Sequence, residues 1–254
     1  MAIYKGNKKI IALYKGNKKI VKQYKGTQVV YDVTNSGGDE DIECSNNTLN
    51  ITYNGNSIDV TFAKYYSDKE TFKADTTNSI NNGDGTYTYS ADLTVNAGIS
   101  YTFENCTNLI RVDCFPSTTS TSKYAMNCFY GCSRLEYANV KDIVTSNITD
   151  ISNMFYACQN LKELDLSGWD VSNVTKCKML FMNCSNLETV NLSGWELNSI
   201  GDNYANDYGY MFNGCSSLKK IILGEISQEA YSWWKTKVID DYDWTDVTIE
   251  YTIV

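Results

Sequence analysis

The chain has 254 residues and a formal net charge of −8, and its 43% hydrophobic and 20% charged residues exclude a disordered or collagen-like chain. Histidine is absent from the sequence, which excludes a Ser-His-Asp triad, a Cys-His dyad and His-ligated zinc. The negative charge argues against a general nucleic-acid binder, so we expect no nucleic-acid partner.

We expect neither a membrane span nor a classical export signal. The longest apolar runs are about four residues, as in Ile10–Leu13, whereas a membrane-spanning helix needs about 20. The first residues, Met1–Gly6, contain no apolar signal core.

Residues 1–33 form a basic segment that repeats every ten residues. Three copies begin with Tyr-Lys-Gly, and eight lysines against one acid give this segment a charge of +7, so the other 221 residues carry −15. Each glycine lies in a turn between strand-prone residues, which predicts a three-stranded antiparallel meander. The predicted strands are Lys8–Leu13, Lys18–Gln23 and Gln28–Val33.

A meander of this size buries too little apolar surface to be stable alone. We therefore expect it to dock on another protein or on copies of itself. We also expect the chain to form a homo-oligomer. Packing of the meander on the rest of the same chain is the alternative. The expected docking residues are the repeated tyrosines and interleaved lysines Tyr4, Tyr14, Tyr24, Lys8 and Lys18.

Residues 34–98 are predicted to contain an acidic linker, Ser36–Asp41, and then a small β module or N-terminal cap. Alternating apolar and polar residues indicate three strands, and Asn-Gly sequences indicate hairpin turns. The strands are Leu49–Tyr53, Ile58–Phe62 and Thr86–Leu93, and the turns are Asn54–Asn56 and Asn82–Gly85.

Residues 99–224 contain five copies of a second repeat, Phe-x-x-Cys-x-x-Leu. Its cysteines are spaced by 26, 26, 26 and 31 residues, at Cys106, Cys132, Cys158, Cys184 and Cys215. In each copy an apolar residue follows this Leu after three positions and another after five. This is the Leu-x-x-Leu-x-Leu pattern typical of leucine-rich repeats. The sequence thus predicts a β-rich fold with short helical turns: a leucine-rich-repeat solenoid of about five repeats, preceded by a small antiparallel β segment.

The repeat pattern Met-Phe-x-x-Cys-x-x-Leu-x-x-Leu-x-Leu-Ser, with Ser-Gly-Trp turns at Trp169 and Trp195, resembles the bacterial surface-type repeats called BspA-like. This resemblance covers about residues 99–224 and implies an adhesin or interaction module. The Tyr-Lys-Gly-Asn-x-x-Ile repeat of residues 1–33 resembles short N-terminal repeats of structural proteins of tailed bacteriophages.

The nine cysteines are interpreted as core residues, with disulfides or a metal site as alternatives. Cys114, Cys128 and Cys177 align with aliphatic residues of other repeats, and the five repeat cysteines would stack as an internal column. We expect reduced thiols, no metal and no other cofactor.

The predicted partner-binding surface is formed by the residues between the apolar positions of each short strand, because these point to one side. They are Arg111, Asp113, Tyr137, Asn139, Glu163, Asp165, Thr189, Asn191, Lys220 and Ile222. A plain solvated face is the alternative. The insertion that lengthens the last spacing offers a second contact site at Tyr204, Tyr208 and Tyr210. Trp169 and Trp195 could stack on sugar rings, but we expect them to pack on each other.

Residues 225–254 are predicted to close the array with a helix at Gln228–Ile239 and a strand at Val247–Val254.

These features favour a non-enzymatic adhesion protein of a tailed-phage virion, a fibre or decoration attached to capsid or tail and assembled in the host cytoplasm. Residues 1–33 would dock on other virion proteins, and the solenoid would bind a host-surface or mucosal glycan or protein. The alternatives are a leucine-rich-repeat adhesin on the bacterial cell surface and, third, a carbohydrate-active enzyme.

Overall fold

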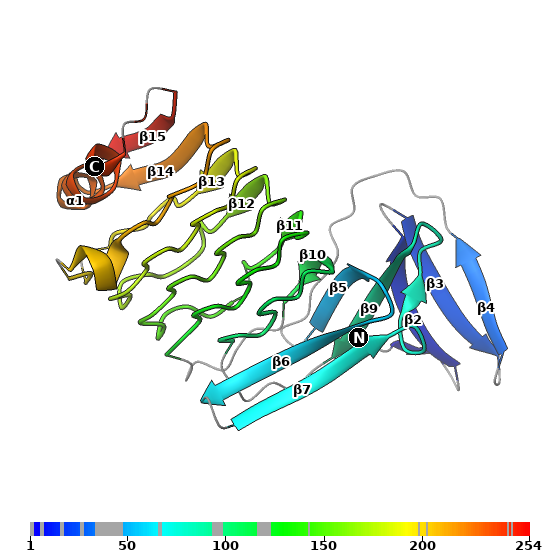
Figure 1. The fold of residues 1–254 in the computed structure, drawn as a ribbon. Coiled ribbons are helices and arrows are strands. Elements are labelled where there is room, and N and C mark those ends of the chain that lie inside the picture. The colour runs from blue at the N-terminus through cyan, green and yellow to red at the C-terminus, as the bar shows by residue number, and fades with distance from the viewer. Residues whose placement is uncertain are drawn as a thin grey trace.

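A computed structural model describes residues 3–5, 8–15, 18–25, 28–33, 48–65, 68–92, 99–115, 123–141, 143–197, 199–201, 203–242, 244 and 246–254. In this part of the chain strands predominate, the helices are few and short, and the sheets are open (Figure 1). None of the helices described is long and apolar enough to cross a bilayer.

The basic N-terminal segment folds as the predicted antiparallel meander, but with four strands instead of three. Ile3–Lys5 adds a strand because it is the counterpart of Leu13–Lys15 in the next repeat. It pairs with the strand that follows it, so that Ile3 lies opposite Ile10. The strands are β1 (Ile3–Lys5), β2 (Lys8–Lys15), β3 (Lys18–Lys25) and β4 (Gln28–Val33).

The next module supplies the strand that covers the first repeat. β5 (Thr48–Asn54) lies between β9 (Thr86–Asp92) and β10 (Leu109–Cys114) and runs antiparallel to both. The three predicted strands are present, and the turn Asn82–Gly85 joins β8 (Ile80–Asn81) to β9 as a hairpin. The predicted linker Ser36–Asp41 lies outside the described residues.

The turn Asn54–Asn56 does not make the predicted hairpin. Both edges of β5 are already paired, so β6 (Ser57–Tyr65) leaves that sheet and pairs instead with β7 (Asp68–Asp75). The sequence pattern did not indicate β7.

Residues 99–226, here called the repeat stack, place equivalent residues of successive repeats side by side (Figure 1). Short parallel strands line one side, with Leu164 opposite Val190 and Val190 opposite Ile221. On another side backbone amides donate to the next repeat, for example from Phe129 N to Met154 O at 2.8 Å. After β10 these strands are β11 (Tyr137–Ala138), β12 (Glu163–Asp165), β13 (Thr189–Asn191) and β14 (Lys220–Ile226).

A column of buried phenylalanines runs through the repeat stack. Neighbouring ring centroids are 5.1 to 5.9 Å apart, and the rings are close to parallel. The members are Phe103, Phe129, Phe155, Phe181 and Phe212. Burial of one such side chain stabilises a fold by about 1.5–3 kcal/mol, so this column is a main source of cohesion between repeats.

The repeat cysteines form the predicted internal column, and each thiol has a defined hydrogen bond. Cys158 Sγ donates to Phe129 O at 3.2 Å and Cys184 Sγ donates to Phe155 O at 2.9 Å, so both of these thiols bind the preceding repeat. Burial raises the pKa of Cys106 to about 12 and that of Cys132 well above its ordinary value. These thiols are therefore protonated hydrogen-bond donors.

The expectation that all thiols are reduced is wrong for Cys114. This residue is disulfide-bonded, to a partner outside the described residues. Cys114 lies in the first repeat, at the end of β10, with its backbone opposite Asn50 of β5. Seven other cysteines are free: Cys106, Cys128, Cys132, Cys158, Cys177, Cys184 and Cys215.

The predicted C-terminal helix and strand are both present at the far end of the repeat stack. Helix α1 (Gln228–Lys237) begins where the Ser227 hydroxyl accepts a hydrogen bond from Ala230 N. The indole of buried Trp234 donates to Trp195 O at 3.0 Å, which fixes the helix to the last full repeat. A 3₁₀ turn (Ile239–Asp241) and β15 (Thr248–Ile253) follow, and β15 runs parallel to β14.

Candidate functional site

The residues predicted to bind a partner lie on one face, here called the strand face, of strands β10 to β14. Apolar side chains such as Val112 and Val190 enter the core, and because side chains alternate along a strand their neighbours point outwards. The register places Glu163 opposite Thr189 and Thr189 opposite Lys220. The predicted residues therefore form two rows that cross the repeats.

The outer row is the more accessible one, because three of its five side chains are exposed and two are half-buried. It consists of Arg111, Tyr137, Glu163, Thr189 and Lys220. The Tyr137 side chain is 41% exposed, and the Arg111 guanidinium carbon lies 4.3 Å from the centroid of its ring. An ion pair of 2.9 Å to Asp113 holds this guanidinium from the other side. Arg111 and Tyr137 thus make a pre-ordered polar and aromatic contact point.

The inner row, Asp113, Asn139, Asp165 and Asn191, serves mainly to build the turns that end the strands. The Asp165 carboxylate accepts from Ser167 N at 3.1 Å, and the Asn191 side chain accepts from Ser193 N at 3.1 Å. Burial acts to raise the pKa of Asp165, but hydrogen bonds from Lys141 and Ser167 outweigh it and lower this pKa. These side chains are occupied by their own chain, so the partner-binding prediction fits the outer row better.

The insertion site is only partly accessible. It forms one turn of π-helix, Tyr204–Tyr208, that directs Tyr208 inwards against Trp233, with ring centroids 5.7 Å apart. Tyr208 is only 7% exposed, so it is not available for partner contact, and that part of the prediction is wrong. Tyr204 is half-buried, and Tyr210 is 41% exposed.

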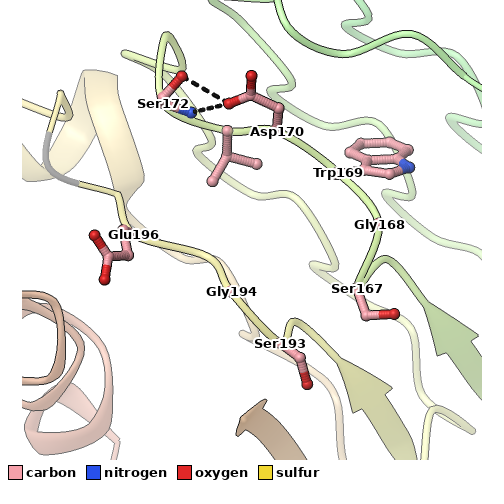
Figure 2. Close-up of a pocket in the computed structure, with 9 residues that line it drawn as sticks. Ser167, Gly168, Trp169, Asp170, Ser172, Ser193, Gly194 and Glu196 are labelled. Atoms are coloured by element: carbon pink, nitrogen blue, oxygen red, sulfur yellow. Dashed lines mark hydrogen bonds between the residues drawn. The ribbon is translucent and has the colours of Figure 1, made fainter. Parts of the chain in front are cut away.

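The tandem Ser-Gly-Trp turns form a shallow hollow that the sequence did not reveal. Asp170 and Glu196 are among the residues that line it (Figure 2), and the hollow has a volume of about 440 Å³. Both carboxylates have partners in the chain: Asp170 accepts from Ser172 N at 3.0 Å, and Glu196 accepts from Ser227 N at 3.1 Å. The signal that could have indicated the hollow is the recurrence of Ser-Gly-Trp after 26 residues.

Trp169 and Trp195 pack on each other, as expected, and do not offer free rings. Their centroids are 6.1 Å apart, and both side chains are buried. Each indole donates to the preceding repeat, Trp169 to Val140 O at 3.1 Å and Trp195 to Leu166 O at 3.0 Å. These contacts leave little of either ring exposed for a sugar to stack on.

The predicted docking residues occupy regular positions in the meander. Tyr4 lies opposite Lys9 and Tyr14 opposite Lys19, while Lys8 and Lys18 lie opposite other lysines. Tyr24 lies opposite Val29. Their backbone is described, but their side chains lie outside the described part of the molecule.

Within the described ranges, no three Cys, Asp or Glu side chains gather in a way that could hold a metal ion. Four column thiols instead face a backbone carbonyl of the preceding repeat, and the fifth, Cys106, faces Asp59 O of β6.

The model of a family described as "Mycoplasma protein of unknown function, DUF285" matches residues 123–243, which include most of the repeat stack and α1. No curated protein and no solved structure matches the chain. The family match is compatible with a BspA-like repeat protein.

Proposed function

We propose that residues 99–224 are a leucine-rich-repeat solenoid that serves as a non-enzymatic binding module. The observation that carries this proposal is the outer row of the strand face, to which each repeat contributes one side chain. Adjacent strands lie about 4.8 Å apart, so these side chains form a regular line suited to an extended partner surface. The proposed partner is a host-surface or mucosal glycan or protein.

The state of the reactive groups supports binding rather than catalysis. A thiol acts as a nucleophile only as a thiolate, and burial raises the pKa of Cys132, Cys158 and Cys177 well above the ordinary value. The acids around the hollow accept hydrogen bonds from backbone amides.

Residues 1–33 are proposed to dock the chain on a tailed-phage virion. Their charge of +7 against −15 for the rest of the chain supports a separate role for this segment. Every hairpin of the meander repeats the same register. The meander therefore offers a regular surface through which several copies of the chain could bind one particle.

A bacterial surface adhesin is the second candidate, favoured by two observations. The family model that matches residues 123–243 is described from Mycoplasma, a bacterium. The disulfide at Cys114 also fits an oxidising extracellular setting better than a reducing cytoplasm.

The binding proposal is tested with the full chain on an array of mucin-type glycans and on intact host cells. We expect the double variant Tyr137→Ala/Glu163→Ala to bind at least about tenfold more weakly, because two adjacent outer-row contacts are lost. Asn160→Ala, exposed and outside the strand face, is the control and should bind normally. Equal binding by all three proteins would exclude the strand face, and release of reducing sugar from the glycans would favour an enzyme.

The location is tested by immunogold labelling of purified phage particles and of bacterial cells with one antibody against the repeat stack. Label on particles supports the virion proposal, whereas label only on cells supports the surface adhesin.

A further inference from the structure

The strands that line the repeat stack end differently at the first and at the last repeat. At the first repeat, the antiparallel strand β5 covers the outer edge of β10. At the last repeat, β15 is the edge strand, and no strand among the described residues pairs with its outer side (Figure 1). An uncovered edge presents unpaired amides and carbonyls to which another strand can bind.

The edge of β15 is apolar and lacks the features that block strand addition. Tyr251, Ile253 and Val254 are 41%, 39% and 74% exposed. No lysine or proline occurs in Val247–Val254, and its single charged side chain, Glu250, is paired with Lys220 at 2.7 Å. Edges that avoid pairing usually carry such residues, so this edge is suited to accept a strand.

The hydrogen bonds to β14 determine which groups of β15 face outwards. Thr248 N donates to Lys219 O at 2.7 Å and Val254 N donates to Ile226 O at 3.2 Å, so the even-numbered residues face inwards. Backbone groups alternate in direction along a strand, and the amides and carbonyls of Ile249, Tyr251 and Ile253 therefore point away from the sheet.

From this geometry we infer that a second copy of the chain pairs with β15 in antiparallel orientation, about a two-fold axis at Tyr251. In this register Tyr251 lies opposite Tyr251 of the second copy, and Ile249 lies opposite Ile253. Each of the three outward-facing residues then donates one backbone hydrogen bond to the residue opposite and accepts one from it, which gives about six hydrogen bonds in total. This inference does not depend on the proposed function.

The side chains agree with the same register. Glu250 lies opposite Thr252 of the second copy, so no like charges meet, and the isoleucines contact each other across the axis. Like-with-like pairing about a two-fold axis is the geometry of an isologous dimer. A pair of short strands buries less surface than a stable dimer needs, so the association is weak and concentration-dependent.

Sedimentation velocity over a range of concentrations tests the inference on the full chain and two matched lysine variants. Tyr251→Lys places two ammonium groups opposite each other on the axis and should weaken self-association at least about tenfold. Thr252→Lys adds the same charge one residue away, opposite Glu250 of the second copy and beside Glu225 of its own chain, and should associate as tightly or more tightly. Thermal melts verify that both variants fold.

A cross-link provides the second readout, and it is specific to this edge even if residues 1–33 also associate. Residues that exchange both bonds have Cα atoms about 5.5 Å apart, within the range that a disulfide spans. Tyr251→Cys should therefore give a covalent dimer on mild oxidation, and Glu225→Cys on β14 should not. Absence of the cross-link, or equal association by both lysine variants, would overturn the inference and assign the edge to a strand of another protein.

Discussion

Replacement of Trp195 by phenylalanine tests whether the indole bonds hold the repeats together. The variant keeps an aromatic ring against Trp169 but loses the bond to Leu166 O. That carbonyl still accepts from Trp169 N at 3.2 Å, so it is not left unpaired, and the lost bond costs about 1 kcal/mol. The smaller ring removes buried area worth about 1–2 kcal/mol more. We expect the free energy of unfolding to fall by about 2–3 kcal/mol.

Trp233→Phe is the matched control, because the Trp233 indole nitrogen is buried without a hydrogen-bond partner among the described residues. Removal of an unsatisfied donor offsets the lost packing, so this variant should stay within about 1 kcal/mol of the parent. Urea unfolding followed by far-ultraviolet circular dichroism measures both, since it does not rely on tryptophan fluorescence. Equal costs for the two replacements would refute the argument that the indole bonds carry stability.

Three further predictions concern the thiols, the turns and the N-terminal segment. Stability should fall as pH rises above about 9, because unfolded thiols ionise there whereas burial raises the pKa of Cys106 to about 12. Each such thiol contributes up to about 1.4 kcal/mol per pH unit, and urea midpoints that do not change from about pH 8 to about pH 10 would contradict this. Gly194→Ala should cost about 1–2 kcal/mol in thermal unfolding because φ is +81° there, while Gly168→Ala, with open space for the methyl group, should be neutral. Deletion of residues 1–33 should abolish incorporation into particles while circular dichroism still reports folded repeats, and normal incorporation would exclude the docking role.

The repeat stack could be predicted because one spacing determines many contacts. Residues 26 positions apart lie next to each other in successive repeats. Alignment of the copies therefore predicts which residues contact each other, including the phenylalanine and cysteine columns. The short strands follow from Leu-x-x-Leu-x-Leu for the same reason. The direction of the thiol bonds could not be predicted, because it depends on the backbone path between columns.

Pairing between distant segments was much less predictable. The contact of β5 with β10 joins residues about 60 positions apart, and no local pattern encodes it. Cys114 aligned with aliphatic residues, which concealed its disulfide. For the inner row a signal existed: Asp165 and Asn191 each precede a serine by two residues, which is typical of Asx turns and indicates that these side chains are already occupied.

The uniform bonding between repeats has a consequence for how this molecule can change over time. Since Phe129 N and Phe155 N make equivalent bonds to the following repeat, a whole 26-residue unit could be duplicated or lost by recombination without the need for a new kind of junction. The length of the repeat stack and the number of side chains in its outer row would then change by one repeat at a time, while the two ends stay the same.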